Sequence, residues 1–354
     1  FEMASYESMR MCTWAKPDPD TLTDLLQHGN NVFVVSMPPY QPKRDGAGEA
    51  ALQTEKIDAI LERLANHGVF VLMSGIPDLF VPFGSEEYQK IMADYLGLLV
   101  PYLESKGFDV TRFALYPWDE PGGHGWDAVE RVAVFGEMVK KVRPDVQVYV
   151  NGGGEVPMFE RMAPVTDIWC PSIYMLPEDS GEMAIMRKSG KALWSYNCAY
   201  GFARPVGANI KDINIIAEFR TAALFAFRYG ASGIGYWCYN IGDDMWQRVR
   251  DEYPLVYPAD NGSVVSRRWE AVREGIEDYR ILVALQNRVE TSQTSVSPEV
   301  RNGIDELQRD LEDWMDKGFQ EMRLGLPRYA FDLTYNERSV NQFRERLLDL
   351  VAAC

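Results

Sequence analysis

Positive charge is scarce in this sequence. Its 354 residues include 52 Asp and Glu against 36 Lys and Arg, which gives a formal net charge of −16. Nucleic acids and anionic membrane surfaces bind proteins through clustered Lys and Arg, so they would repel a chain with this balance. We therefore expect neither of them as a partner.

Long apolar runs and paired cysteines are also missing. No segment approaches the ~20 apolar residues that span a bilayer, and no signal peptide is visible. The chain starts at Phe1 rather than Met, so we expect a trimmed chain whose missing signal does not indicate the compartment. The 5 cysteines include no CxxC pair, and we expect neither a metal site nor another cofactor.

Eight short runs rich in Val, Ile, Tyr, Phe or Trp are flanked by turn residues, and helical patterns separate them. The predicted strands are 8–14, 31–37, 68–74, 112–118, 146–152, 167–172, 191–198 and 233–240. The predicted helices are 18–28, 48–66, 85–106, 126–142, 156–163, 180–188, 213–229 and 266–289. Alternation of this kind predicts the α/β class and a parallel sheet, and eight strands favour a (β/α)₈ TIM-type barrel.

An open doubly wound sheet is the alternative if 8–14 is not a strand. No glycine-rich nucleotide fingerprint follows a strand, so that fold would lack its usual ligand. After about residue 290 the pattern changes to a loop and amphipathic helices. We therefore predict a catalytic barrel over 1–290 and a C-terminal helical extension over 291–354 that packs on the barrel.

The stretch "YPWDEP" places two acids, Asp119 and Glu120, after the fourth predicted strand. Active sites of (β/α)₈ enzymes lie at the carboxyl ends of the strands, which makes these acids catalytic candidates. Pro121 biases Glu120 toward an extended backbone. An isolated Asp-Glu pair is usually a solvated turn, but the strand end and the neighbouring Trp118 favour a site.

Barrel glycosidases of the large retaining clan often carry Asn-Glu-Pro at this position and a second Glu at the seventh strand. Here Asp119 replaces the Asn, and the seventh strand, "KALWSYNCAY", has no carboxylate. A conventional retaining pair flanks the scissile bond at ~5 Å, which adjacent residues cannot easily do. Two acids on one side suit substrate-assisted hydrolysis, in which the sugar's 2-acetamido oxygen attacks the anomeric carbon. Glu120 would be the general acid and later the base, while Asp119 would orient the acetamide.

At these residues the chain resembles the catalytic region of family 123 glycoside hydrolases, the β-N-acetylgalactosaminidases. "YPWDEP" is similar to the family's Asp-Glu pair, and "SVVSRRWEAVREGIEDYRIL" (263–282) is similar to its Ser-Arg…Arg-Glu-Gly…Asp-Tyr signature. The resemblance implies a (β/α)₈ barrel, a retaining substrate-assisted mechanism through an oxazoline-type intermediate and terminal β-linked N-acetylhexosamine as substrate, with GalNAc expected. It favours a secreted, periplasmic or cell-surface location and a glycan or glycoconjugate partner. Members usually carry an N-terminal β-sandwich, and whether one precedes Phe1 does not follow from the sequence.

The helix that contains the second motif has an apolar stripe at helical spacing, so we interpret it as structural. Polar and aromatic residues near strand ends are the substrate-binding candidates, because an acetamide pocket needs apolar walls and a hydroxyl to orient the carbonyl. Tyr174 is our choice for that hydroxyl, and Trp194 and Trp237 are our choices for sugar-facing platforms. The full set is Trp118, His124, Asn151, Trp169, Tyr174, Trp194, Tyr196, Trp237, Tyr239 and Asn240.

Two alternatives stay open at this point. The first is a glycosidase of another specificity, with Glu120 as acid/base and Asp243, Asp244 or Glu178 as the second carboxylate. The second is a non-catalytic carbohydrate-binding barrel that uses the Trp residues. Neither the choice between GalNAc and GlcNAc nor the oligomeric state follows from the sequence.

Overall fold

The computed structural model describes residues 2–42, 50–197, 216–240, 246, 254–260, 262–291, 297–323 and 337–353. The chain divides into two compact units. One consists of Phe1–Ala15, Asp20–Asn30 and Ser195–Cys354, and the other of Lys16–Pro19 and Asn31–Trp194.

The Asn31–Trp194 unit alternates strands with helices along the chain. Its strands in the main sheet are β2 (Val32–Ser36), β5 (Phe70–Ser74), β6 (Phe113–Tyr116), β7 (Gln147–Asn151), β8 (Ile168–Cys170) and β9 (Ala192–Leu193). Its α-helices are α2 (Glu55–Leu64), α3 (Glu86–Ser105), α4 (Trp126–Val142), α5 (Val156–Met162) and α6 (Gly181–Ser189). Short 3-10 helices add η2 (Ala65–His67), η3 (Pro121–His124) and η4 (Ile173–Met175).

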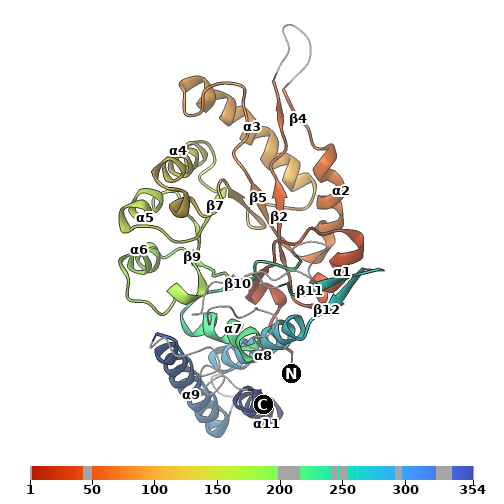
Figure 1. Cartoon of the computed structure of the whole chain (residues 1–354), viewed down its shortest axis with the longest axis vertical. Helices are drawn as coiled ribbons and strands as arrows, with labels where there is room; N and C mark the ends of the chain where they lie inside the picture. The colour runs from red at the N-terminus through yellow and green to blue at the C-terminus, as the bar shows by residue number, and fades with distance from the viewer. Residues whose placement is uncertain are drawn as a thin grey trace. The chain divides into compact units, whose positions relative to one another are not determined.

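Burial explains why these strands lack polar alternation. Every residue of β6 and of β8 is buried, as expected for parallel strands that are covered on both faces. The helices α4, α5 and α6 lie side by side in Figure 1 and cover the sheet with apolar faces. Ser85 caps the first turn of α3, where its Oγ accepts a hydrogen bond from the Tyr88 amide at 3.1 Å.

The other unit contains two strands of the main sheet and most of the C-terminal helices. Strand β1 (Arg10–Cys12) pairs in parallel with β10 (Gly233–Gly235). Its helices are η1 (Tyr6–Ser8), α1 (Pro19–Gln27, of which Pro19 belongs to the other unit), α7 (Ile216–Arg228), α8 (Arg267–Thr291), α9 (Pro298–Arg323) and α11 (Glu337–Ala353). The helices α9 and α11 pack against each other and against α7 and α8 (Figure 1).

Two small antiparallel ribbons were not expected from the sequence. Strands β3 (Tyr40–Gln41) and β4 (Ala51–Leu52) form one, and β11 (Val256–Ala259) and β12 (Gly262–Val265) form the other. Both are short and carry weak apolar alternation, which explains why strand periodicity misses them.

The main sheet has eight strands in the order β10-β1-β2-β5-β6-β7-β8-β9. The pairings β1–β10, β2–β5, β5–β6, β6–β7, β7–β8 and β8–β9 are parallel. This order is that of a (β/α)₈ TIM-type barrel with added C-terminal helices, so the predicted fold and its eight strands are confirmed. A domain boundary at residue 290 stays a prediction. Among the helices in the described part of the chain, none is long and apolar enough to cross a membrane.

Candidate active site

The two acids follow directly on β6. Beyond Tyr116 the chain leaves the sheet, and Asp119 is exposed while Glu120 is half-buried. Oδ1 of Asp119 accepts one hydrogen bond from the Tyr116 hydroxyl and a second from Nδ2 of Asn151, at 2.8 Å. Both donors are neutral groups. They therefore fix the position of this carboxylate without cancelling its charge.

Asn151, the last residue of β7, connects the two acids. Its Nδ2 donates to Asp119, and its Oδ1 accepts a hydrogen bond from the backbone N–H of Glu120 at 3.0 Å. The side chain is buried, and both ends of its amide are in use, so its orientation is fixed. The sequence predicts a sugar contact for Asn151. The structure places its amide between the two acids, and the sugar contact stays a prediction.

The backbone of Glu120 differs from the prediction. The following proline predicts an extended conformation, but φ is 45° and ψ is 55°, in the left-handed region. Pro121 begins η3, and the Gly123 N–H donates to the Glu120 carbonyl at 2.9 Å. This bond and the one from Asn151 hold a conformation that costs on the order of 1–3 kcal/mol at a residue other than glycine. Such outliers are typical of functional sites.

Two glycines allow the loops after β6 and β7 to meet. A Cβ added at Gly152 would lie 3.0 Å from both Cα and Cβ of Glu120. A Cβ added at Gly122 would lie 2.2 Å from the backbone oxygen of Gly153. The contact at Gly122 leaves no room for a side chain, and at Gly152, where φ is +90°, a side chain would be strained and would press on Glu120. The position of Glu120 therefore depends on glycine at both places.

A pocket of about 690 Å³ opens beside Asp119. Its wall comes from the loop between β5 and α3, from the segment after β6 and from the helices α3 and α4. The predicted substrate-binding residues Trp118 and His124 both line it, and their rings meet edge to face with centroids 6.4 Å apart. The sequence prediction did not include the other large side chains of the wall, which are Ile76, Val81, Phe83, Tyr88, Tyr116 and Arg131.

Two predicted sugar-binding tryptophans of this unit lie in the core instead. Trp169 is 1% exposed, and its Nε1 donates to Oγ of Ser189 at 3.2 Å, so the indole points toward the helical layer. Trp194 is 6% exposed and packs against Phe70 and Tyr149. Tryptophan at a strand end is equally a core residue of large barrels, and strand alternation alone does not reveal which face is buried.

Three more predicted residues follow β9 and β10 in the other unit. Trp237 is 43% exposed, whereas Tyr196 is buried, and the rings of both pack edge to face on Trp14. Trp14, which follows β1, was not among the predicted residues, although it also is a Trp at a strand end. Tyr239 is a structural residue instead, since it is 2% exposed and its hydroxyl donates to Asp24 at 2.8 Å.

The remaining candidates stay predictions. Asn240 is exposed, and its backbone oxygen accepts a contact from Cys238 Sγ. Tyr174 lies half-buried in η4, and Glu178 is exposed just after it. Asp243 and Asp244 lie outside the described residues. Within the part of the chain that the structure describes, no group of three or more His, Cys, Asp and Glu side chains is arranged to hold a metal ion.

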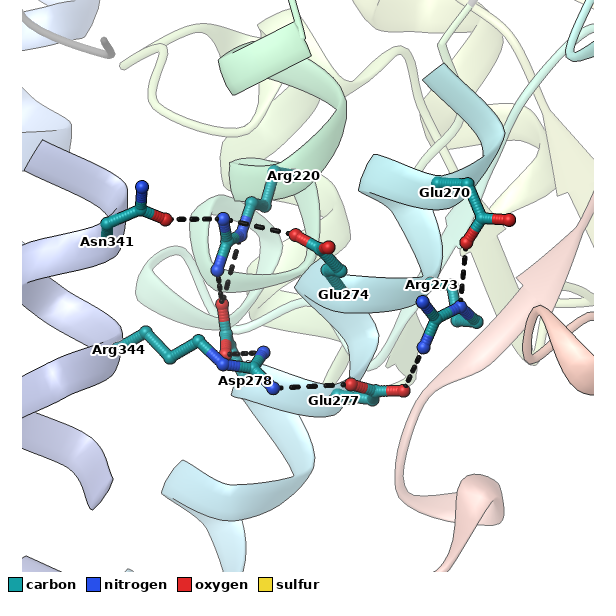
Figure 2. Close-up of polar contacts among 8 residues, drawn as sticks. All are labelled: Arg220, Glu270, Arg273, Glu274, Glu277, Asp278, Asn341 and Arg344. Carbon is teal, nitrogen blue, oxygen red and sulfur yellow. Dashed lines mark hydrogen bonds and ion pairs between the residues drawn. The ribbon is translucent and has the colours of Figure 1, made fainter. Parts of the chain in front are cut away.

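The second motif of the sequence builds a structural ionic network on α8 (Figure 2). Asp278 is fully buried, and its carboxylate lies 2.6 Å from Nη1 of Arg344 on α11 and 3.4 Å from Nε of Arg220 on α7. Arg220 also contacts Glu274 at 3.1 Å. A Cβ at Gly275 would lie 2.0 Å from the backbone oxygen of Arg220, so α7 and α8 cross in close contact. The motif thus joins three helices, which agrees with the structural interpretation.

Solved structures share this fold at low sequence identity. A family 123 glycoside hydrolase from Clostridium perfringens, described in a study of glycolipid glycan hydrolysis, aligns with a TM-score of 0.57 and 12% identity over 92% of this chain and 71% of that one. A glucosidase from Croceicoccus marinus aligns with a TM-score of 0.51 and 15% identity, over 77% of this chain and 66% of that one. No curated protein matches the sequence.

The family is shown by the sequence between β5 and α8. Residues 73–285, which are more than half of the chain, match the family described as "Glycoside hydrolase 123, catalytic domain". This segment contains the acid pair, Asn151, the pocket and the ionic motif of α8. The protein therefore belongs to glycoside hydrolase family 123 and is a glycosidase.

Proposed function

We propose that this protein removes terminal β-linked N-acetylgalactosamine with retention of configuration, by a substrate-assisted mechanism that uses Glu120 and Asp119. The observation that carries the proposal is the bridge made by Asn151. It hydrogen-bonds to the carboxylate of Asp119 and to the backbone of Glu120, which supports a role for the two neighbouring residues together. Adjacent acids cannot flank a sugar from opposite faces, but they can act together when the substrate supplies its own nucleophile.

In the first step Glu120 donates its proton to the glycosidic oxygen as the bond to the anomeric carbon breaks. The acetamide carbonyl oxygen attacks that carbon from the other face, and the product is a bicyclic oxazolinium ion. Asp119 accepts a hydrogen bond from the acetamide N–H and stabilises the positive charge that develops there. Because Tyr116 and Asn151 both donate to Oδ1, we assign the acetamide contact to Oδ2.

In the second step Glu120, now a carboxylate, removes a proton from water. The water oxygen bonds to the anomeric carbon, the bond to the acetamide oxygen breaks, and the acetamide is restored. Two inversions give net retention. The strained backbone of Glu120 supports a functional role for this residue, because such strain is typical of active sites.

A panel of 4-nitrophenyl β-glycosides tests the proposal. We expect hydrolysis of the GalNAc glycoside, little hydrolysis of the galactoside that lacks the acetamide, and inhibition by a thiazoline analogue of the oxazolinium ion. Turnover of the galactoside at the rate of the GalNAc compound would refute substrate assistance. Preference for GlcNAc would refute the sugar assignment but leave the mechanism standing.

The alternative mechanism uses a second protein carboxylate, for which Glu178, Asp243 and Asp244 are the candidates. Alanine variants at these positions separate the two mechanisms. If azide restores activity to one of them and forms a glycosyl azide of inverted configuration, that residue is a nucleophile and the substrate-assisted proposal is wrong.

A further inference from the structure

We propose that Asp24 of α1 is a positioning residue for sugar binding, and that it acts by holding the segment of chain that presents Trp237 to the substrate. The hydroxyl of Tyr239 is the link between the two. The inference rests on the proposed function in one respect, because it takes Trp237 as a residue that contacts the sugar. It places one determinant of that contact on a helix, whereas the active-site residues of barrels come from the ends of strands.

Trp237 and Trp14 form an aromatic pair at two neighbouring strand ends. Trp237 follows β10 and Trp14 follows β1, and these two strands pair in parallel. The rings meet edge to face with centroids 6.2 Å apart, and Trp237 is 43% exposed. The carboxyl ends of barrel strands carry the active site, so an exposed indole at this place can stack on a sugar ring.

Buried tyrosines on both sides of Trp237 tie this segment to helices. Tyr236 is 1% exposed, and its hydroxyl donates to the Phe219 carbonyl of α7 at 3.3 Å. Tyr239 is 2% exposed, and its hydroxyl donates to Oδ2 of Asp24 at 2.8 Å. A hydrogen bond to a carboxylate is roughly twice as strong as one between neutral groups. The bond to Asp24 is therefore the stronger of these two.

The carboxylate of Asp24 is itself held in place by its neighbours. Its Oδ2 also accepts a hydrogen bond from Nε1 of Trp269 on α8 at 2.9 Å, and its Oδ1 lies 3.2 Å from Nδ1 of His28. The rings of His28 and Trp269 stack with centroids 4.6 Å apart, and Tyr239 meets Trp269 edge to face at 5.8 Å. This cluster joins α1 to α8, so Asp24 offers the Tyr239 hydroxyl an acceptor whose position is fixed.

The backbone of Tyr239 connects this anchor to the second tryptophan. Its N–H donates to the Thr13 carbonyl at 3.2 Å, and Thr13 directly precedes Trp14. Oγ1 of the buried Thr13 donates in turn to Oδ1 of Asn30, which follows α1, at 2.9 Å. Trp14 has a φ of 50°, a conformation that surrounding contacts must hold in a residue other than glycine. Loss of the Tyr239 hydroxyl should therefore loosen the segments that carry both tryptophans.

Tyr239→Phe removes the hydroxyl and keeps the ring, and Tyr229→Phe is its matched control. The Tyr229 hydroxyl donates to Oδ1 of Asp316 on α9 at 2.6 Å, which is the same kind of bond, but Tyr229 precedes β10 whereas Trp237 follows it. Tyr239→Phe should lower kcat/KM about fivefold, mainly through a higher KM, because a contact made in both the ground state and the transition state is weakened. Tyr229→Phe should keep the wild-type values, and Asp24→Ala should lose at least as much as Tyr239→Phe.

A double-mutant cycle with Trp237→Ala separates positioning from general loss of stability. Trp237→Ala alone should lower kcat/KM about tenfold, since one aromatic contact is lost. In that background Tyr239→Phe should change kcat/KM by less than about twofold, because the side chain that it positions is gone. The same loss in both backgrounds would show that the hydroxyl acts elsewhere and would overturn the proposal, and so would an unchanged kcat/KM in either single variant. Circular dichroism and thermal unfolding check that each variant keeps its fold.

Failure of the proposed function gives a different result. The cycle uses whichever glycoside the panel identifies as a substrate, so a wrong GalNAc assignment or a wrong mechanism leaves the comparison intact. Fluorine NMR of protein labelled with fluorotryptophan gives a readout that needs no turnover, and the Trp237 resonance is assigned by its loss in Trp237→Phe. This resonance should shift or broaden in Tyr239→Phe and stay in place in Tyr229→Phe. A resonance that is unchanged in both variants would refute the positioning role.

Discussion

Asp119 belongs to the Asp-Glu motif after β6, and Asp278 belongs to the motif on α8; both motifs resemble those of family 123. The surroundings of the two carboxylates are opposite. Asp119 is exposed, and its carboxylate accepts hydrogen bonds from the neutral groups of Tyr116 and Asn151. Asp278 is fully buried, and its carboxylate lies between the guanidinium groups of Arg220 and Arg344 (Figure 2). Neutral donors position a charge and leave it available, whereas arginines cancel it.

The comparison separates two reasons for keeping an acid in a motif. A catalytic carboxylate must act on a substrate, so it is held from one side and left open on another. A structural carboxylate in the interior must satisfy all of its hydrogen-bonding capacity within the protein. We expect substitutions of the first kind to affect rate and substitutions of the second kind to affect stability.

The largest effect should come from Glu120→Gln. Loss of the general acid should lower kcat/KM for a glycoside with a basic leaving group by a factor on the order of 10²–10⁴, because protonation in the transition state is lost. Asp119→Asn should show a similar decrease. Both variants should unfold within about 1 kcal/mol of wild type in a urea titration. Nearly full activity in Glu120→Gln would mean that another residue is the acid.

Asp278→Ala should show the opposite pattern. It leaves the half-buried Arg220 and Arg344 without their shared partner and opens a buried cavity, so the free energy of unfolding should fall by about 3 kcal/mol. At a temperature well below the transition, kcat/KM should stay within about twofold of wild type. Arg346→Ala removes an exposed ion pair with Asp310 on α9 and serves as the matched control, with an expected loss below about 1 kcal/mol. A large fall in kcat in folded Asp278→Ala would contradict the structural role.

Asn151→Ala tests whether the bridge positions the acids. The substitution removes a hydrogen bond to each acid, and we expect kcat to fall roughly 10- to 100-fold while KM changes little, because the loss is in orientation. Tyr116→Phe removes only one of the bonds to Asp119 and should cost less. A rise in KM at unchanged kcat would instead support the sugar contact that the sequence predicts for Asn151.

Glu120→Gly separates strain from chemistry. Glycine adopts the left-handed conformation of this position without a steric penalty, so the free energy of unfolding should rise by about 1 kcal/mol while activity is lost. Glu120→Ala loses the same carboxyl group but keeps the Cβ. It should therefore be less stable than Glu120→Gly, and equal stabilities would show that the backbone stores no strain there.

The smallest expected effect on stability concerns a third aspartate, Asp24 of α1. Its partner is the histidine His28, which can gain or lose a proton. Oδ1 of Asp24 lies 3.2 Å from Nδ1 of the buried His28. Burial alone would lower the pKa of His28, but the hydrogen bonds and charge of Asp24 raise it above the ordinary 6.5. Burial likewise opposes ionisation of Asp24, yet hydrogen bonds from His28, Tyr239 and Trp269 lower its pKa below 3.8.

The two shifts predict a pH window for stability. The contribution of His28 is complete below pH 6.5 and is lost as the pH rises through its raised folded pKa, while that of Asp24 is present above pH 3.8 and is lost on acidification. Thermal unfolding should therefore show a maximum between these values. In His28→Asn the loss of stability on the alkaline side of this pH profile should become smaller by about 1 kcal/mol. An unchanged pH profile would contradict the assignment.

The fold could be predicted from the sequence because apolar runs and helix periodicity recur eight times. Even β9, only two residues long in the structure, stood out as "KALWSYNC". The acid pair could be found because the active-site residues of (β/α)₈ barrels lie at the carboxyl ends of the strands. The conformation of Glu120 could not, since it depends on Asn151 and Gly152 of the next strand and loop.

The aromatic residues show where strand patterns stop being informative. Trp194 and Trp237 carry the same local signal, yet one is 6% and the other 43% exposed. Phe83 lies in a loop with no periodicity, so its place in the pocket depends on contacts with Tyr88 and Arg131 that only tertiary structure supplies. The positions of such side chains are determined by packing between loops.

The contact between the loops after β6 and β7 also has a consequence for how this protein tolerates mutation. Gly122 and Gly152 have no side chain with which to bind a sugar, yet a Cβ at Gly122 would collide with backbone and one at Gly152, where φ is +90°, would be strained. In a saturation mutagenesis library selected for activity, both positions should be as intolerant as the acids themselves. The exposed Gly123 between Gly122 and His124 has open space around it and should accept substitution freely. A map of inactive variants would then mark the active site partly by residues that never meet the substrate.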